Sequence, residues 1–207
     1  MQPPSAASAT SPRSDARRKH AQLVGAAREL FATVGVDVSV EEITKRAGVG
    51  MGTLYRHFAT KEELIDAVLE AAFQEYVAVA ELALTRADPW LGFCEFVERA
   101  LALQARNRGL RDVVATAAND LARMAALRRR LRPLTARLVA RAQEHGSLRA
   151  DFAAEDVSLL LWGGHGVIER SEGIAPEIWR RYLGFVFDGL RSDAATPLTR
   201  KPMRPSS

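Results

Sequence analysis

The sequence of 207 residues contains one cysteine, Cys94, and only four histidines, at positions 20, 57, 145 and 165. A lone cysteine excludes an intrachain disulfide and a cysteine-based metal site, and it favours the cytoplasm. The histidines do not have the spacing of metal ligands, and no glycine-rich phosphate loop is present. We therefore expect a protein that is not an enzyme and uses no metal or cofactor. Detectable turnover of a small molecule would revive the enzymatic alternative.

Long apolar runs are also missing. No stretch of 18 or more consecutive apolar residues occurs, so we expect no membrane-spanning helix. The segment 1–5 has no basic stretch followed by an apolar one, so it does not predict a secretory signal. Strand-like alternation and internal repeats are absent. With 47% apolar residues, the chain predicts an all-α protein with one small domain and one larger helical core.

The segment 39–61 has the pattern of two short helices joined by a tight turn. Ser39 and Glu42 stand three residues apart, which is the spacing of a capping box at the start of a helix. Gly48 can take a positive φ and end that helix. Apolar residues four apart then predict a second short helix at about 51–58. This arrangement predicts a helix-turn-helix.

A second capping-box spacing, between Thr60 and Glu63, predicts a long third helix. The second short helix suits the major groove of DNA, where side chains near its N-terminus reach base edges. Lys61 begins the third helix, where free N–H groups already favour a phosphate. The residues expected to bind DNA are Lys45, Met51, Gly52, Thr53, Tyr55, Arg56, His57 and Lys61. The alternative is an ordinary helical hairpin with a solvated polar face.

The stretch AGVGMGTLYRHFATKEEL at 47–64 is similar to the motif of the TetR/AcrR family of bacterial regulators. The preceding helix is similar to the family's first helix, so the resemblance spans about residues 17–75, and a weaker likeness covers 142–151. The resemblance implies an N-terminal three-helix helix-turn-helix DNA-binding domain and a larger helical domain that binds a small molecule and dimerises. It predicts a homodimeric transcriptional regulator of double-stranded DNA, a repressor released from a palindromic operator by a small, largely apolar ligand.

Two positions depart from the family pattern. Gly50 stands where the family commonly has serine, so the second short helix loses a side-chain cap, which costs only a few tenths of a kcal/mol. Glu41 stands where some members place a basic or polar DNA contact, and a carboxylate there repels phosphate. Both departures leave the operator sequence open.

Positive charge is concentrated in the segment 13–61. It holds nine Lys/Arg against five Asp/Glu, a net charge of +4 that equals the formal net charge of the entire chain. A phosphate-binding surface requires such an excess of cations. The basic run 13–19 either reaches DNA or is a solvated helix start.

The rest of the chain keeps a helical pattern. Helices are predicted at about 89–106, 110–122, 125–145, 154–171 and 176–190. Pro133 should kink or split the third of these. We divide the chain into an N-terminal arm without fixed structure (1–14), the helix-turn-helix domain (15–61), the ligand-binding and dimerisation domain (62–191) and a disordered tail (192–207).

The helix predicted at 154–171 is apolar nearly all round, and such a helix must bury every side. One side suits the core of the subunit and the other suits a second copy of the chain, with Gly163, Gly164 and Gly166 allowing close backbone approach. The residues expected at the dimer interface are Leu160, Trp162, Gly163, Val167, Ile178, Tyr182, Phe185 and Val186. The alternative is that both final helices only form the core of a monomer.

A small-molecule pocket is implied by the resemblance. The candidate pocket residues are Trp90, Phe93, Asn119, Met124, Trp162 and His165. Asn119 and His165 are of most interest, because polar groups among apolar helices need a partner. Each candidate is also compatible with plain core packing. An architectural DNA-binding protein that needs no ligand is a further alternative, and it predicts weak sequence preference and no internal cavity.

Overall fold

The computed structural model describes residues 12–106, 121–193 and 196–202. Within these ranges the regular structure is helical, apart from one isolated bridge between Leu148 and Arg191. The helices are α1 (Pro12–Thr33), α2 (Val40–Ala47), α3 (Met51–His57), α4 (Lys61–Leu84), α5 (Pro89–Arg106), α7 (Leu121–Glu144), α8 (Asp156–Ser171) and α9 (Ile178–Leu190). The all-α prediction is confirmed. In the same ranges, no helix has the length and apolar character needed to cross a membrane.

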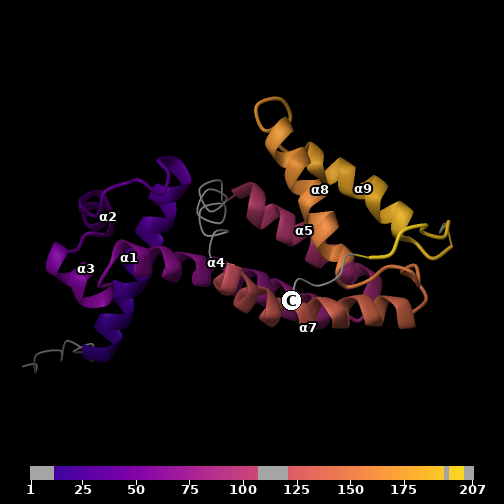
Figure 1. Cartoon of the computed structure of the whole chain (residues 1–207), viewed down its shortest axis with the longest axis horizontal. Helices are drawn as coiled ribbons and strands as arrows, with labels where there is room; N and C mark the ends of the chain where they lie inside the picture. Colours follow the sequence, from indigo (N-terminus) through magenta and orange to yellow (C-terminus); the bar gives the residue numbers. More distant parts are fainter. Residues whose placement is uncertain (1–11, 107–120, 194–195, 203–207) are drawn as a thin grey trace, which may run out of the picture.

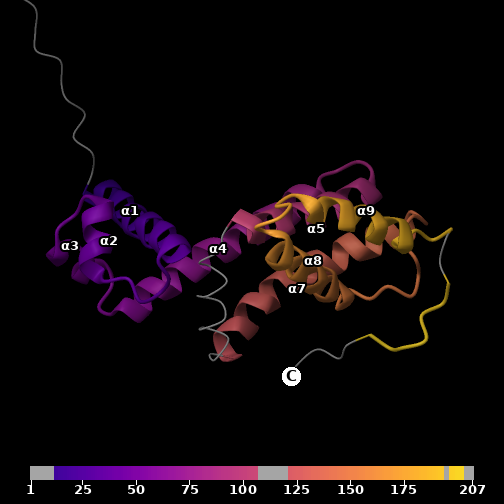
Figure 2. The same cartoon turned by 90° about the horizontal axis from the view of Figure 1, so that it is seen from above.

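The molecule is elongated, with two groups of helices joined by α4 (Figure 1). Helices α1, α2 and α3 gather at one end around the start of α4. Helix α4 then runs into a body made with α5, α7, α8 and α9, and it packs against both α5 and α7. Helices α8 and α9 form a hairpin whose arms lie side by side in both views (Figures 1 and 2).

Helix α4 belongs to two hydrophobic cores. Leu64 and Val68, in its first half, are buried in a core with α1, α2 and α3. Ala80 and Ala83, near its end, are buried in the larger core of the body. The helical spacing of these apolar residues therefore continues through α4, while their packing partners change along its length.

The two predicted capping boxes hold the helices of the N-terminal end. The Glu42 N–H donates to Ser39 Oγ over 3.2 Å, and the Ser39 N–H donates to Glu42 Oε2 over 3.3 Å. At the second site the Glu63 N–H donates to Thr60 Oγ1 over 3.2 Å. The reciprocal bond there comes from Ala59 N–H to Glu63 Oε2 over 2.7 Å, one residue before the expected donor. Both helix starts are confirmed.

The turn between α2 and α3 depends on Gly48. Its φ of 68° lies in the left-handed region, which a glycine adopts without steric strain, and its N–H bonds back to the end of α2. Gly50 caps α3 with no side-chain hydrogen bond, as expected from the missing serine. Sequence and structure therefore agree on how this turn is made.

Some boundaries differ from the sequence-based expectations. Helix α1 begins at Pro12, inside the predicted arm. Helix α7 continues through Pro133 without splitting. Pro133 and Arg129 are both exposed, so water can satisfy the Arg129 carbonyl that the proline leaves without its helical partner. The helix predicted at 110–122 lies almost entirely outside the described residues.

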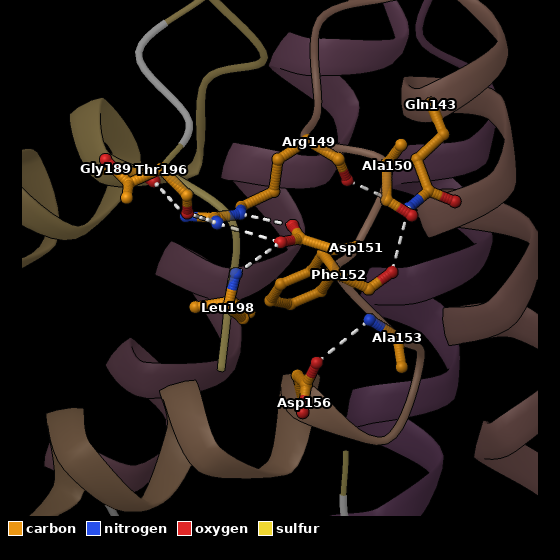
Figure 3. Close-up of polar contacts among 10 residues, drawn as sticks. All are labelled: Gln143, Arg149, Ala150, Asp151, Phe152, Ala153, Asp156, Gly189, Thr196 and Leu198. Atoms are coloured by element: carbon orange, nitrogen blue, oxygen red, sulfur yellow. Dashed lines mark hydrogen bonds and ion pairs between the residues drawn. The ribbon is translucent and has the colours of Figure 1, made fainter. Parts of the chain in front are cut away.

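An ion pair between Arg149 and Asp151, here called the Arg149–Asp151 clasp, joins the loop after α7 to the C-terminal segment (Figure 3). Arg149 Nε donates to Asp151 Oδ1 over 2.6 Å, and its Nη1 donates to the Gly189 carbonyl over 3.2 Å. The same guanidinium donates to the Thr196 carbonyl, and the Leu198 N–H donates to Asp151 Oδ2 over 2.9 Å. The structure thus fixes part of 196–202, where the sequence predicts a disordered tail.

The clasp also affects the titration of its carboxyl group. The hydrogen bond from Arg149, helped by the backbone N–H of Leu198, lowers the pKa of Asp151 from 3.8 to about 2. Beside it, Gln143 Nε2 donates to the carbonyls of Arg149 and Phe152, over 3.0 and 2.8 Å. The loop after α7 is therefore held both by a side chain of α7 and by backbone groups of α9 and the C-terminal segment.

Candidate nucleic-acid interface

Apolar residues on the inner side of α3 anchor it to the hydrophobic core of this end. Leu54 is fully buried and Phe58 is 3% exposed, and both belong to the core that contains α1 and the start of α4. The Thr44 hydroxyl donates to Met51 Sδ over 3.5 Å, which links α2 to the first residue of α3. These contacts hold α3 against α2 and leave the opposite side of α3 facing outward.

The outward side of α3 carries most of the residues that the sequence indicates. Lys45, Gly52, Tyr55 and Arg56 are exposed, and Tyr55 is 53% exposed despite its large ring. Met51, Thr53, His57 and Lys61 are half-buried. The eight predicted DNA-binding residues therefore lie on α2, on α3 and in the first turn of α4.

Arg56 folds back along its own helix. Its Nε donates to the Gly52 carbonyl over 3.0 Å, and its Nη2 donates to Thr53 Oγ1 over 3.3 Å. Since the two contacts occupy only part of the guanidinium, which carries five N–H donors, the group keeps donors for a base or a phosphate.

His20, on α1, is a neighbour of α3 that sequence reasoning missed. Its ring lies 4.8 Å from the Phe58 ring and 5.9 Å from the His57 ring, measured between centroids. Burial, together with the nearby charge of His57, lowers the pKa of His20 below 6.5. Helical spacing places His20 one turn before Leu23, at the edge of the core stripe. No pattern in the sequence shows which residue of α3 it meets.

The basic residues of this end are partly engaged with acids. Arg46 donates to Glu29 on α1 through its Nε, over 2.8 Å. Lys19 lies 2.8 Å from the Asp15 carboxylate, which Arg18 also contacts. These exposed pairs are worth little in water and leave the long side chains able to exchange partners.

The predicted pocket residues lie in three different environments. Trp90 and Phe93 are buried in the body, with ring centroids 6.0 Å apart, and Arg191 covers the Trp90 ring at 4.6 Å. His165 is half-buried, with Nε2 3.4 Å from the Glu169 carboxylate. Trp162 is 56% exposed on the surface of α8, a position that does not fit the pocket prediction. Asn119 and the side chain of Met124 lie outside the described part of the chain.

The exposed apolar side chains of α8 and α9 form what we call the α8–α9 face. Its members are Leu159, Trp162, Ile178 and Phe185, which are 45%, 56%, 41% and 65% exposed. Leu159 was not predicted. Leu160, Val167, Tyr182 and Val186, which were predicted at an interface, are partly buried against the core of their own subunit.

The glycines of α8 bring helices together within one chain. A Cβ at Gly163 would stand 2.5 Å from the Tyr182 hydroxyl of α9, and one at Gly164 would stand 2.4 Å from Leu101 Cδ1 of α5. Within the subunit these two glycines therefore allow close approach between helices of one chain, and their contact with a second copy stays a prediction. Their place between neighbouring helices explains why no larger side chain stands there.

Comparisons with known proteins agree with this architecture. Residues 23–68 match the model of the family described as bacterial regulatory proteins, tetR family. Residues 88–192, about half of the chain, match the model described as transcriptional regulator SbtR-like, C-terminal domain.

Individual relatives resemble either part or nearly all of the chain. An HTH-type transcriptional regulator of Staphylococcus aureus (strain USA300) is 41% identical over 59 residues, which span 28% of this chain and 32% of that protein. The crystal structure of a TetR regulatory protein from Mycobacterium vanbaalenii is 28% identical, with a TM-score of 0.67 over 86% of this chain and 98% of that one. A TetR regulator of Streptomyces coelicolor is 26% identical, with a TM-score of 0.67 over 84% and 98% of the two chains. The chain thus belongs to the TetR family and is a transcriptional regulator with a helix-turn-helix DNA-binding domain.

Proposed function

We propose that the protein is a homodimeric repressor that binds a palindromic operator through α3 and leaves it when a small, largely apolar ligand binds the helical body. The observation that carries this proposal is the course of α4. Only three residues separate its start from the end of α3, and its last turns are buried in the body. A displacement of α4 in the body therefore moves the recognition helix.

Ion pairs fasten α4 to the helices on both sides. Arg28 on α1 binds Glu75 on α4 through both terminal guanidinium nitrogens, Nη2 at 3.0 Å. Arg130 on α7 binds Glu70 on α4. Because α4 is linked to α1 and to α7 within two turns, a shift of α7 has a direct route to the DNA-binding end.

The α8–α9 face supports the homodimer. Four large apolar side chains exposed on adjacent helices are a surface that water solvates poorly and that a second copy can bury. Two copies related by a twofold axis present two α3 helices to half-sites about 34 Å apart, one turn of DNA. A single helix of seven residues makes too few contacts for a tight site.

In this proposal the exposed residues of α3 and Lys61 contact DNA, in the cytoplasm where bacterial DNA is found. Release requires that the ligand bind the non-DNA conformation more tightly, and a coupling of about 1–3 kcal/mol corresponds to a 5–150-fold change in operator affinity.

Selection from random double-stranded DNA with purified protein at physiological salt tests the proposal. An enriched inverted repeat is the expected result, and it supplies the probe for a screen of small apolar ligands. Enrichment of a single half-site would contradict the dimer. Salt-sensitive binding with no enriched sequence would favour the architectural alternative.

A further inference from the structure

Two imidazole rings meet beside the surface proposed to contact DNA. His20 and His57, here called the histidine pair, have ring centroids 5.9 Å apart with an angle of 64° between planes. The His20 ring also lies against the ring of Phe58, which is almost fully buried. Because Phe58 is fixed by the core, it holds the His20 ring near His57.

The surroundings of the histidine pair disfavour protonation of His20 in the free protein. The Phe58 ring shields one side of the otherwise exposed His20 ring from water, and a charge on His57 repels a charge on His20, so the pKa of His20 lies below 6.5. The other charged groups on the adjoining helix segments are Asp15, Arg17, Arg18 and Lys19 of α1, Glu41, Glu42, Lys45 and Arg46 of α2, Arg56 of α3, and Lys61, Glu62 and Glu63 of α4.

The acids in this set are partly engaged. Asp15 is bound by Arg18 and Lys19, Glu42 accepts the N–H of Ser39, and Glu63 accepts the N–H of Ala59. The cations outnumber the acids, so the balance of charge around the histidine pair is positive. A further proton there is unfavourable until an anion arrives.

DNA supplies that anion. His57 is the last residue of α3, and Lys61 is the first residue of α4, whose N-terminal N–H groups favour a phosphate. A phosphate at this place attracts an imidazolium on either ring and outweighs the repulsion between them. The protonated pair is thus more stable in the complex than in the free protein.

We propose that the histidine pair takes up a proton when the protein binds DNA, and that His20 thereby determines how operator affinity depends on pH. This inference rests on the proposed function, because it requires α3 to face DNA. By linkage, uptake of one proton makes binding tighter as pH falls, by at most about tenfold per pH unit. Between pH 8 and pH 6 we expect a gain of several-fold to tens of fold.

The test is fluorescence anisotropy with the operator duplex obtained by selection, at pH 6, 7 and 8 and at constant salt, since phosphate binding depends on salt. Wild-type protein should bind most tightly at pH 6. His20→Gln should bind as wild type does at pH 8, within about twofold, and should lose most of the gain at pH 6. His145→Gln is the matched control, because His145 lies at the end of α7, exposed and near Ser147. This control should keep the wild-type pH profile.

Calorimetry of wild-type protein provides a measurement that does not depend on a variant folding. Binding enthalpies at pH 7 in two buffers of different ionisation enthalpy give the number of protons taken up, and we expect a value between about 0.3 and 1. A value of zero, or a His20→Gln variant that keeps the full pH dependence, overturns the inference. If no duplex is bound specifically at any pH, the proposed function fails instead.

Discussion

The DNA-binding end and the helical body fix their helix ends by different means. At the DNA-binding end, Ser39 and Thr60 cap α2 and α4 through residues three positions away. In the body, Arg141 of α7 donates to the carbonyls of Leu84 and Arg86 and so caps the end of α4 from a distant part of the chain. Local caps can be read from a sequence, whereas long-range caps depend on the fold.

The exposed surfaces of the DNA-binding end and the helical body also differ in chemical character. Around α3 most of the exposed side chains are polar or charged, of both signs, and Tyr55 is the large aromatic exception. The α8–α9 face instead exposes four large apolar side chains on two helices. Under the proposed function, the DNA-binding end binds charged DNA with an affinity that depends on salt. The α8–α9 face binds the apolar face of a second copy with an affinity that does not.

The sharpest way to break this contrast is to place a charge on the α8–α9 face. If the proposed dimer forms through this face, Trp162→Arg or Phe185→Arg should yield a monomer in sedimentation velocity, because the interface would have to bury an unpaired guanidinium. Operator affinity should fall by about 100-fold or more once the two half-sites are bound independently. Leu91→Arg is the control, since Leu91 is 59% exposed on α5, outside the face. An intact dimer in both α8–α9 variants would refute the assignment.

A second set of changes tests the charged end. Tyr55→Ala and Lys61→Ala should weaken binding to all duplexes alike, by about tenfold each, and Lys61→Ala should lower the salt slope by about one. Thr53→Ala and Arg56→Ala should also change which sequences are bound, by about 1–3 kcal/mol at a contacted base pair. Arg137→Ala, exposed on α7, serves as the control in the same mobility-shift titrations. Operator binding like wild type in all four variants would show that α3 is not the recognition helix.

A third prediction concerns the Arg149–Asp151 clasp, which joins the loop after α7 to the distant C-terminal segment. Since the pKa of Asp151 is lowered from 3.8 to about 2, its contribution to stability is complete above about pH 4 and is lost as pH falls towards 2. Asp151→Asn should lower the melting temperature at pH 7 by a few degrees and make it less steeply dependent on pH between 4 and 2. Thermal melts across this range measure both effects. Asp193→Asn, an exposed acid near the chain end, should change neither.

The smallest expected effects are at the local caps. Ser39→Ala should lower the free energy of unfolding by about 1 kcal/mol and Ser39→Gly by a few tenths, because glycine is the better uncapped residue. Gly50→Ser should raise it by a few tenths, since the added Cβ meets no atom within 4 Å and the backbone is already extended. Urea titrations of the three variants rank them. A stabilising Ser39→Ala would contradict the capping box.

These differences explain how much could be predicted from the sequence. The helix predicted at about 89–106 is confirmed as α5, which begins at Pro89, and the Trp90 N–H donates to Asp88 Oδ1 over 2.8 Å. Helix α2, the Gly48 turn and α3 were predictable for the same reason, because each depends on residues a few positions apart.

Features that depend on distant segments were not predictable. The sequence shows that Gly163 and Gly164 permit close approach, but only the fold shows that Tyr182 and Leu101 are the groups that approach. Two other features depend likewise on which surfaces are buried and which are exposed to solvent. They are the contact of His20 with α3 and the continuation of α7 through Pro133. Periodicity gives the face of a helix without giving its neighbour.

Helix α4 also has a consequence for how the molecule unfolds. Since its first half completes one core and its last turns complete the other, neither core can lose α4 without exposing apolar surface of its own. The two ends should therefore melt in one cooperative transition, and amides of α2 should exchange with deuterium at a rate set partly by the stability of the distant body. A ligand that stabilises the body would then slow exchange at the DNA-binding end without touching it.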